Sequence, residues 1–235
     1  KTAAFDTTGI FVGNLGSVTT TVGNGVTMTL TAVIADGKTI NGTGGTVAIT
    51  DLHSTLGADL SGITATTKTA AFDATGIFEG NLGSVTTTVA ANKTMTLTAA
   101  LANGKTIVGT GGTVDITAGD VTKDAVLSGI TTDISSYAAT DGTIITGPLP
   151  ADGSCTIKNN ITLNADSLLN TNAAYVIIAT KKLTATAARL TGHAISGNGT
   201  VDITAGEGAK DAVLSGITTA SLAPSPAVIS TVPLP

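Results

Sequence analysis

Few residues of this chain belong to the types that perform acid–base or metal chemistry. Its two histidines, His53 and His193, stand at non-equivalent places in different repeats, which favours exposed turn histidines over a catalytic or metal-binding pair. Asp115 and Asp202 recur at matching positions, but Ala48 takes that place in the first repeat. We therefore interpret both aspartates as outward-facing strand residues, not as the paired carboxylates of a glycoside hydrolase. The sequence predicts no catalytic residue, no metal ligand and no cofactor, and hence a protein that is not an enzyme.

Three further chemical features have structural interpretations. The single cysteine, Cys155, excludes an internal disulfide, and the strand-like stretch 155–157 predicts a small buried side chain there. The glycine-rich stretch 109–115 approaches the pattern of a calcium-binding nonapeptide solenoid, but the other repeats lack it. The sequence leaves calcium binding and glycosylation open. The Asn-x-Thr sequons begin at Asn41, Asn92, Asn160 and Asn198.

The composition favours a thin aliphatic core over an ordinary globular one. Hydrophobic residues make up 42% of the chain, yet aromatic residues make up 3% and tryptophan is absent. Since aromatic side chains normally supply much of the area that a compact core buries, rows of Ala, Val, Ile and Leu must fill this interior. Stacked-turn solenoids have such an interior, because each turn packs on its neighbours instead of around one centre.

The charge pattern argues against two classes of partner. Charged residues make up 11% of the chain, the net charge is −5, and Arg189 is the only arginine, so no basic surface for nucleic acid is expected. No apolar run reaches the roughly 20 residues that a membrane-spanning helix requires. We therefore expect no nucleic-acid partner and no membrane span.

Two short phrases occur three times and organise the chain. Each copy of Gly-Thr-Val-x-Ile-Thr is followed, at a constant distance, by Leu-Ser-Gly-Ile-Thr. Residues 1–22 and 68–89 are nearly identical. The same offset relates the two repeats without a gap as far as Leu60, whose copy in the second repeat is Leu127. Such a constant offset indicates tandem duplication. The phrases occupy residues 45–50 and 60–64, 112–117 and 127–131, and 199–204 and 214–218.

The repeats divide the chain into five segments. They are repeat unit 1 (1–67), repeat unit 2 (68–132), a proline-containing linker or edge segment (133–150), a divergent repeat unit 3 (151–220) and a proline-rich tail (221–235). Proline cannot donate to a strand ladder, which is why we assign the two proline-containing segments outside the repeats. We expect a short helix at 166–174. The chain begins in mid-pattern, which we interpret as processing or as an excerpt of something longer.

Within each unit the apolar residues follow a strand-like alternation. Val26, Met28 and Leu30 alternate with threonines, and Asp36-Gly37 is a turn signal. We expect an all-β chain, a parallel β-solenoid (β-helix) built from tandem repeats with turns of about 20 residues and about three turns in each unit. The alternative is a series of tandem antiparallel β-sandwich repeats, which the scarcity of aromatic residues disfavours.

The phrases at 37–40, 45–50 and 60–64 resemble turns of bacterial β-strand-repeat surface proteins, the adhesin-like or filament-forming β-solenoids. This resemblance covers most of the chain and implies an extracellular or cell-surface structural protein. It carries over no catalytic residue. The leading hypothesis is a structural subunit of an extracellular bacterial filament, sheath or surface array, assembling with itself head to tail into an oligomer or polymer.

Two sets of residues are candidates for binding. The tail contains a β-prone run between prolines that would bridge successive copies by strand addition. The alternative function, an adhesin or ice-binding module, would use flat threonine-rich faces. The assembly candidates are Ala227, Val228, Ile229 and Val232, and the surface-binding candidates are Thr27, Thr29, Thr31, Thr94, Thr96 and Thr98.

Overall fold

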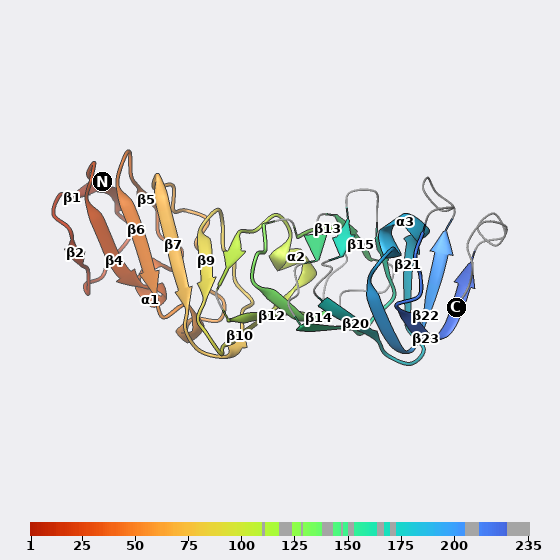
Figure 1. The fold of residues 1–235 in the computed structure, drawn as a ribbon. Helices are drawn as coiled ribbons and strands as arrows, with labels where there is room; N and C mark the ends of the chain where they lie inside the picture. The colour runs from red at the N-terminus through yellow and green to blue at the C-terminus, as the bar shows by residue number, and fades with distance from the viewer. Residues whose placement is uncertain are drawn as a thin grey trace. The chain divides into compact units, whose positions relative to one another are not determined.

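Parallel β-strands build this chain into a β-solenoid (Figure 1). The computed structural model describes residues 1–109, 111–117, 124–127, 129–137, 143–146, 148–149, 153–163, 167–169, 173–204 and 212–224. These residues form two compact units. The first consists of Lys1–Leu97 with Lys105–Thr113 and Gly129–Thr132, and the second contains the other described residues.

The first unit contains two complete sheets and the parallel pair of β8 and β10, which belongs to a larger sheet. The strand orders of the two complete sheets are β1-β3-β5 and β11-β9-β7-β6-β4-β2. The single-turn helix α1 (Ala32–Ala35) and the 3-10 turn η1 (Leu52–Ser54) lie at corners. The strands that lie wholly or mainly in this unit are β1 (Thr2–Phe5), β2 (Gly9–Ile10), β3 (Thr19–Val22), β4 (Thr27–Thr31), β5 (Ile40–Asn41), β6 (Thr46–Thr50), β7 (Thr67–Phe72), β8 (Gly76–Ile77), β9 (Thr86–Val89), β10 (Thr94–Thr98) and β11 (Ile107–Val108).

The second unit is also built from parallel strands. On one side of β22 the strand order is β13-β15-β18-β21, and on its other side β20, β17 and β14 follow in that order. None of the helices in the described ranges has the length and apolar character needed to cross a membrane. The helices here are α2 (Ala99–Ala102) and α3 (Ala187–Leu190), and the strands are β12 (Thr113–Thr117), β13 (Asp124–Val126), β14 (Asp133–Tyr137), β15 (Thr143–Thr146), β16 (Pro148–Leu149), β17 (Gly153–Ile157), β18 (Ile161–Leu163), β19 (Leu168–Leu169), β20 (Ala173–Ile177), β21 (Lys182–Thr186), β22 (Ala194–Thr204) and β23 (Ile217–Pro224).

The register of the strand pairs confirms the predicted parallel solenoid. In both units, neighbouring strands of the described residues run parallel. The step between paired residues is one turn of the coil, and it varies from short steps such as Thr2 to Thr19 to long ones such as Ile40 to Ile63. These steps lie on both sides of the expected turn length of about 20 residues. The alternative of antiparallel sandwich repeats is therefore wrong.

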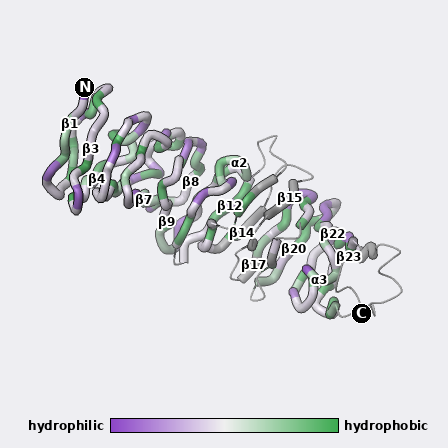
Figure 2. The backbone as a smooth tube through the Cα atoms, turned by 90° about the horizontal axis from the view of Figure 1, so that it is seen from above, coloured by the Kyte–Doolittle hydropathy of each residue, from purple (hydrophilic) through white to green (hydrophobic). Residues whose placement is uncertain are grey.

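The interior is filled by every second residue of the strands. In β4, β6, β10 and β12 the residues alternate between buried and half-buried without exception. Figure 2 shows hydrophobic residues recurring along the tube and few strongly hydrophilic stretches. The predicted aliphatic rows are confirmed as core. Val47, Ile49, Leu60 and Ile63 are buried, as are Val114, Ile116, Leu127, Ile130, Val201, Ile203, Leu214 and Ile217.

One repeat does not correspond to a whole number of turns. Three successive turns lead from Ala3 to Thr20, from Thr20 to Ile40 and from Ile40 to Ile63. The copy of Ala3 in the second repeat is Ala70, which lies a further part of a turn beyond Ile63, so one repeat spans three turns and part of a fourth. As a result, β7 pairs with β6 and β9, whereas its counterpart β1 belongs to a separate sheet with β3. Equivalent strands of successive repeats therefore lie on different faces.

Two sequence-based expectations for the later part of the chain need correction. Residues 133–150, expected to be a linker or an edge, contain β14, β15 and β16, and β15 pairs in parallel with both β13 and β18. This segment therefore continues the solenoid, while Pro148 occupies a two-stranded sheet with β19, a position that proline tolerates. The described residues of 166–174 contain β19 and the start of β20 instead of a helix. In β20, Ala173, Tyr175 and Ile177 point into the core at every second position, which is the period of a strand.

Candidate functional site

The outward side of β4, β6, β7 and β9 carries a dense set of threonines, which we call the threonine face. In each of these strands the outward residues alternate with residues that point into the interior. Hydroxyl and methyl groups therefore dominate this side of one sheet. The threonine face consists of Thr27, Thr29, Thr31, Thr46, Thr50, Thr67, Thr69, Thr86 and Thr88, with Ala48 and Ala71 between them.

The strand register aligns these threonines into rows. Thr27 pairs with Thr46, and Thr46 pairs with Thr67. In the next row, Thr69 pairs with Thr86 on one side and with Ala48 on the other. Neighbouring strands lie about 4.8 Å apart, and alternate residues of one strand lie about 6.6 Å apart. The face is therefore a two-dimensional lattice of small amphipathic groups with two regular spacings.

The second predicted threonine row does not belong to this lattice. Thr27, Thr29 and Thr31 lie on β4, but Thr94, Thr96 and Thr98 lie on β10, which pairs with β8 in another sheet. Their separation follows from the extra part of a turn in each repeat. The Thr94 hydroxyl lies 2.8 Å from the Thr113 hydroxyl, so this row makes its own contacts.

The first turn exposes apolar side chains whose copies in the second repeat are buried. In the second repeat a preceding turn covers them, and there Asn81 N–H donates to the Ala58 carbonyl at 2.9 Å while Leu60 N–H donates to the Asn81 carbonyl at 2.7 Å. We call the exposed set the apolar edge. It consists of Ala3, Phe5, Phe11, Leu15 and Val18, which are exposed or half-buried, whereas Ala70, Phe72, Phe78, Leu82 and Val85 are buried.

The last described strand, β23, lies beside the strand that contains the third Gly-Thr-Val-x-Ile-Thr phrase. Its partner is β22, and Ile217 at its start is buried together with Leu214. Residues 214–218 are the third copy of the Leu-Ser-Gly-Ile-Thr phrase, whose first copy, at 60–64, belongs to the turn that covers the second repeat. The predicted assembly residues Ala227, Val228, Ile229 and Val232 lie outside the described residues.

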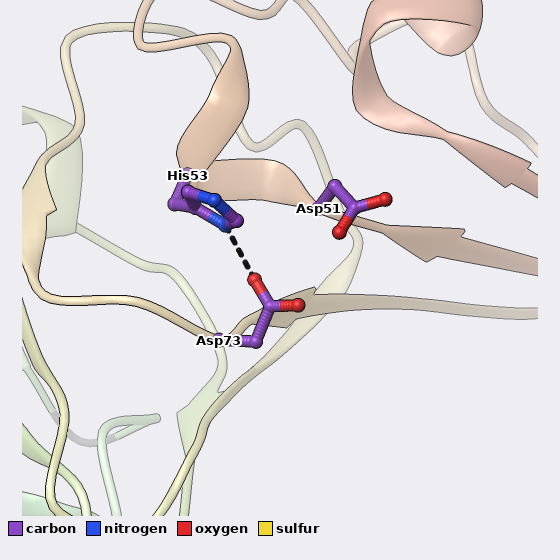
Figure 3. Close-up of side chains that lie close together, drawn as sticks. All are labelled: Asp51, His53 and Asp73. Atoms are coloured by element: carbon purple, nitrogen blue, oxygen red, sulfur yellow. Dashed lines mark hydrogen bonds and ion pairs between the residues drawn. The ribbon is translucent and has the colours of Figure 1, made fainter.

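The two histidines differ in their surroundings. His193 is buried, so the prediction of an exposed turn is wrong for it; its carbonyl lies directly against the next turn at Gly216. His53 is half-exposed in η1, and its Nδ1 lies 2.5 Å from Asp73 Oδ1 (Figure 3). The neighbouring Leu52 is buried, so η1 packs on the core. Sequence analysis missed the pair of His53 and Asp73, although one turn of the predicted length joins their positions.

The remaining candidates occupy the places that the sequence predicted. Cys155 is buried in β17, and burial raises the pKa of its thiol to about 12, with the Asp115 carboxylate adding to the rise. The thiol therefore stays protonated and enclosed at neutral pH. Asp115 and Asp202 lie on the outward side of β12 and β22, where Lys182 Nζ binds Asp202 Oδ2 at 3.0 Å. Both aspartates are thus surface strand residues.

Comparison with protein-family models, curated proteins and solved structures found no match to this chain. Function has to be argued from the geometry itself. Three features carry that argument: the threonine face, the apolar edge together with strand β23, and the cluster around His53.

Proposed function

We propose that this protein is a structural subunit of an extracellular bacterial filament, sheath or surface array, in which copies join head to tail through stacked solenoid turns. The observation that supports this proposal is the difference between the two repeats at the apolar edge. The same five apolar positions are covered by a turn in the second repeat and open in the first. A turn from another copy would bury them in the same way.

The last described turn is suited to cover the apolar edge of another copy. It carries the phrase 214–218, which matches the phrase 60–64 of the covering turn, and its strand β23 pairs in parallel with β22 as β7 pairs with β6. Burying a Phe or Leu side chain contributes about 2 kcal/mol. Because this contact joins two different surfaces, it propagates into a fibre instead of closing into a dimer.

Sedimentation velocity over a range of concentrations tests the role of the apolar edge. We expect the unmodified chain to form larger species as concentration rises, and Phe11→Asp to weaken association at least tenfold by placing a charge in a buried contact. The matched control is Ile10→Asp. Ile10 is 74% exposed, and its copy Ile77 remains 53% exposed although a turn precedes it, so assembly should not bury this position.

Two outcomes would contradict this proposal. One is an unmodified chain that stays monomeric at every concentration. The other is an Ile10→Asp variant that dissociates as completely as Phe11→Asp, because charge alone, and not the burial of the apolar edge, would then explain the effect.

The register of the threonine face supports a second candidate function, an adhesin or ice-binding module that contacts an ordered surface. Rows of hydroxyl and methyl groups at regular spacings are suited to a periodic partner such as an ice plane. We expect measurable thermal hysteresis that falls by more than half in Thr69→Tyr, whose bulky ring interrupts the lattice. Thr96→Tyr on β10 is the control and should keep the activity. Absent hysteresis, or equal loss in the two variants, would remove this candidate.

A further inference from the structure

We propose that Asp51, His53 and Asp73 form a binding site for a divalent transition-metal ion of the zinc class. Asp51 follows β6, His53 lies in η1 directly after it, and Asp73 follows β7, so two segments from adjacent turns come together. Their candidate ligand atoms all lie within 4.8 Å of one another. Figure 3 shows His53 and Asp73 directed toward each other, with the Asp51 carboxylate beside them.

The donor set fits a zinc-class ion better than a hard cation. One imidazole nitrogen and two carboxylate oxygens are ligands that zinc takes at about 2.0–2.2 Å in tetrahedral geometry, which places its ligand atoms about 3.3–3.6 Å apart. A bound ion therefore needs side-chain movements of about 1 Å: the widest separations shorten, and the 2.5 Å between His53 Nδ1 and Asp73 Oδ1 widens. The side chains of His53 and Asp73 are 35% and 41% exposed, so they have room for this movement. Three protein ligands leave a position for water or for another molecule.

The charges of the cluster also favour a cation. Two carboxylates lie near one imidazole, which bonds to Asp73 alone, and among the described residues no lysine or arginine forms an ion pair with either carboxylate. The Asp51 carboxylate accepts one long bond, from the Thr50 hydroxyl at 3.4 Å. Asp73 bonds to His53, so a bound ion would replace this bond with coordination by both side chains.

The cluster is not a feature of the repeat. The offset between the repeats places Ala118 and Asp120 at the positions of Asp51 and His53, and these two residues cannot supply the same ligands. Asp6 is the copy of Asp73 in the first repeat and is exposed. The repeated scaffold therefore does not need the three ligands for its own architecture, and Asp6 provides a matched control.

Isothermal titration of the untagged full chain with Zn²⁺ alone tests the site. We expect one ion per chain, and an affinity at least tenfold weaker in His53→Ala and in Asp73→Asn. Asp6→Asn should bind as tightly as the unmodified chain. All three positions are at the surface, and the thermal midpoint of each variant without metal checks that it is folded.

Three results would overturn the proposal. The first is a chain that takes up no Zn²⁺ at a stoichiometric level. The second is an Asp6→Asn variant that loses as much affinity as Asp73→Asn, because binding would then follow net charge. The third is uptake of Ca²⁺ or Mg²⁺ with no uptake of Zn²⁺, which would assign the carboxylates to a hard cation and leave His53 without a role.

Discussion

Gly62→Ala is expected to lower the free energy of unfolding by about 3 kcal/mol, since a side chain forced into a filled space strains its surroundings. A Cβ atom at Gly62 would lie 2.4 Å from the Lys38 carbonyl oxygen of the preceding turn. That oxygen belongs to the backbone, so it cannot rotate away as the end of a side chain could. The same 2.4 Å approach occurs at Gly129 and at Gly216. This contact explains why glycine stands in all three copies of Leu-Ser-Gly-Ile-Thr.

Urea denaturation followed by circular dichroism measures this effect, and Gly57→Ala is the matched control. Gly57 lies in the same turn, is exposed, and a Cβ atom there would meet no atom within 4 Å. Its substitution should change the free energy of unfolding by no more than about 0.5 kcal/mol. Equal losses in the two variants would show that the close approach between turns is not the cause.

Thr20→Val and Thr87→Val are expected to raise stability, each by about 1 to 2 kcal/mol, because a buried polar group without a partner carries a desolvation cost. Thr20 and Thr87 are equivalent residues of β3 and β9, and both are buried. Neither hydroxyl has a hydrogen-bond partner among the residues that the structure describes. Valine has nearly the same shape and keeps the β-branched form that strands favour.

Thr132→Val provides the opposite test within the same unit. Thr132 is also buried, but its hydroxyl donates to the Gly112 carbonyl at 2.6 Å. Its replacement removes this bond and should lower stability by about 1 to 2 kcal/mol. The three variants are therefore expected to change the urea midpoint with opposite signs, and a loss of stability in Thr20→Val or Thr87→Val would contradict the described interior of β3 and β9.

The local architecture could be predicted from the sequence because its signals are local. Alternation with a period of two placed Val47 and Ile49 in the core, and the constant offset between the repeats identified equivalent positions such as Leu60 and Leu127. The sheet that each strand joins could not be predicted, because it depends on how far the length of a repeat exceeds a whole number of turns. Turns differ in length along the chain, so a small error in their assumed length moves a strand to another face.

The candidate sites were less predictable for the same reason. Thr29 and Thr96 have nearly identical neighbours in sequence, yet they lie in different sheets. Phe11 and Phe78 are copies of each other, and only the turn stacked before the second one buries it. The meeting of His53 and Asp73 follows from the length of one turn, which a general scan for ligand spacing does not consider. All three cases depend on contacts between turns, which carry no local sequence signature.

Electron microscopy of the purified full chain, beside Phe11→Asp and Ile10→Asp at the same concentration, tests the proposed assembly most directly. We predict unbranched filaments from the unmodified chain and from Ile10→Asp, because neither changes the apolar edge, and isolated particles from Phe11→Asp. Isolated particles in all three samples, or equally long filaments from Phe11→Asp, would contradict head-to-tail stacking through the apolar edge.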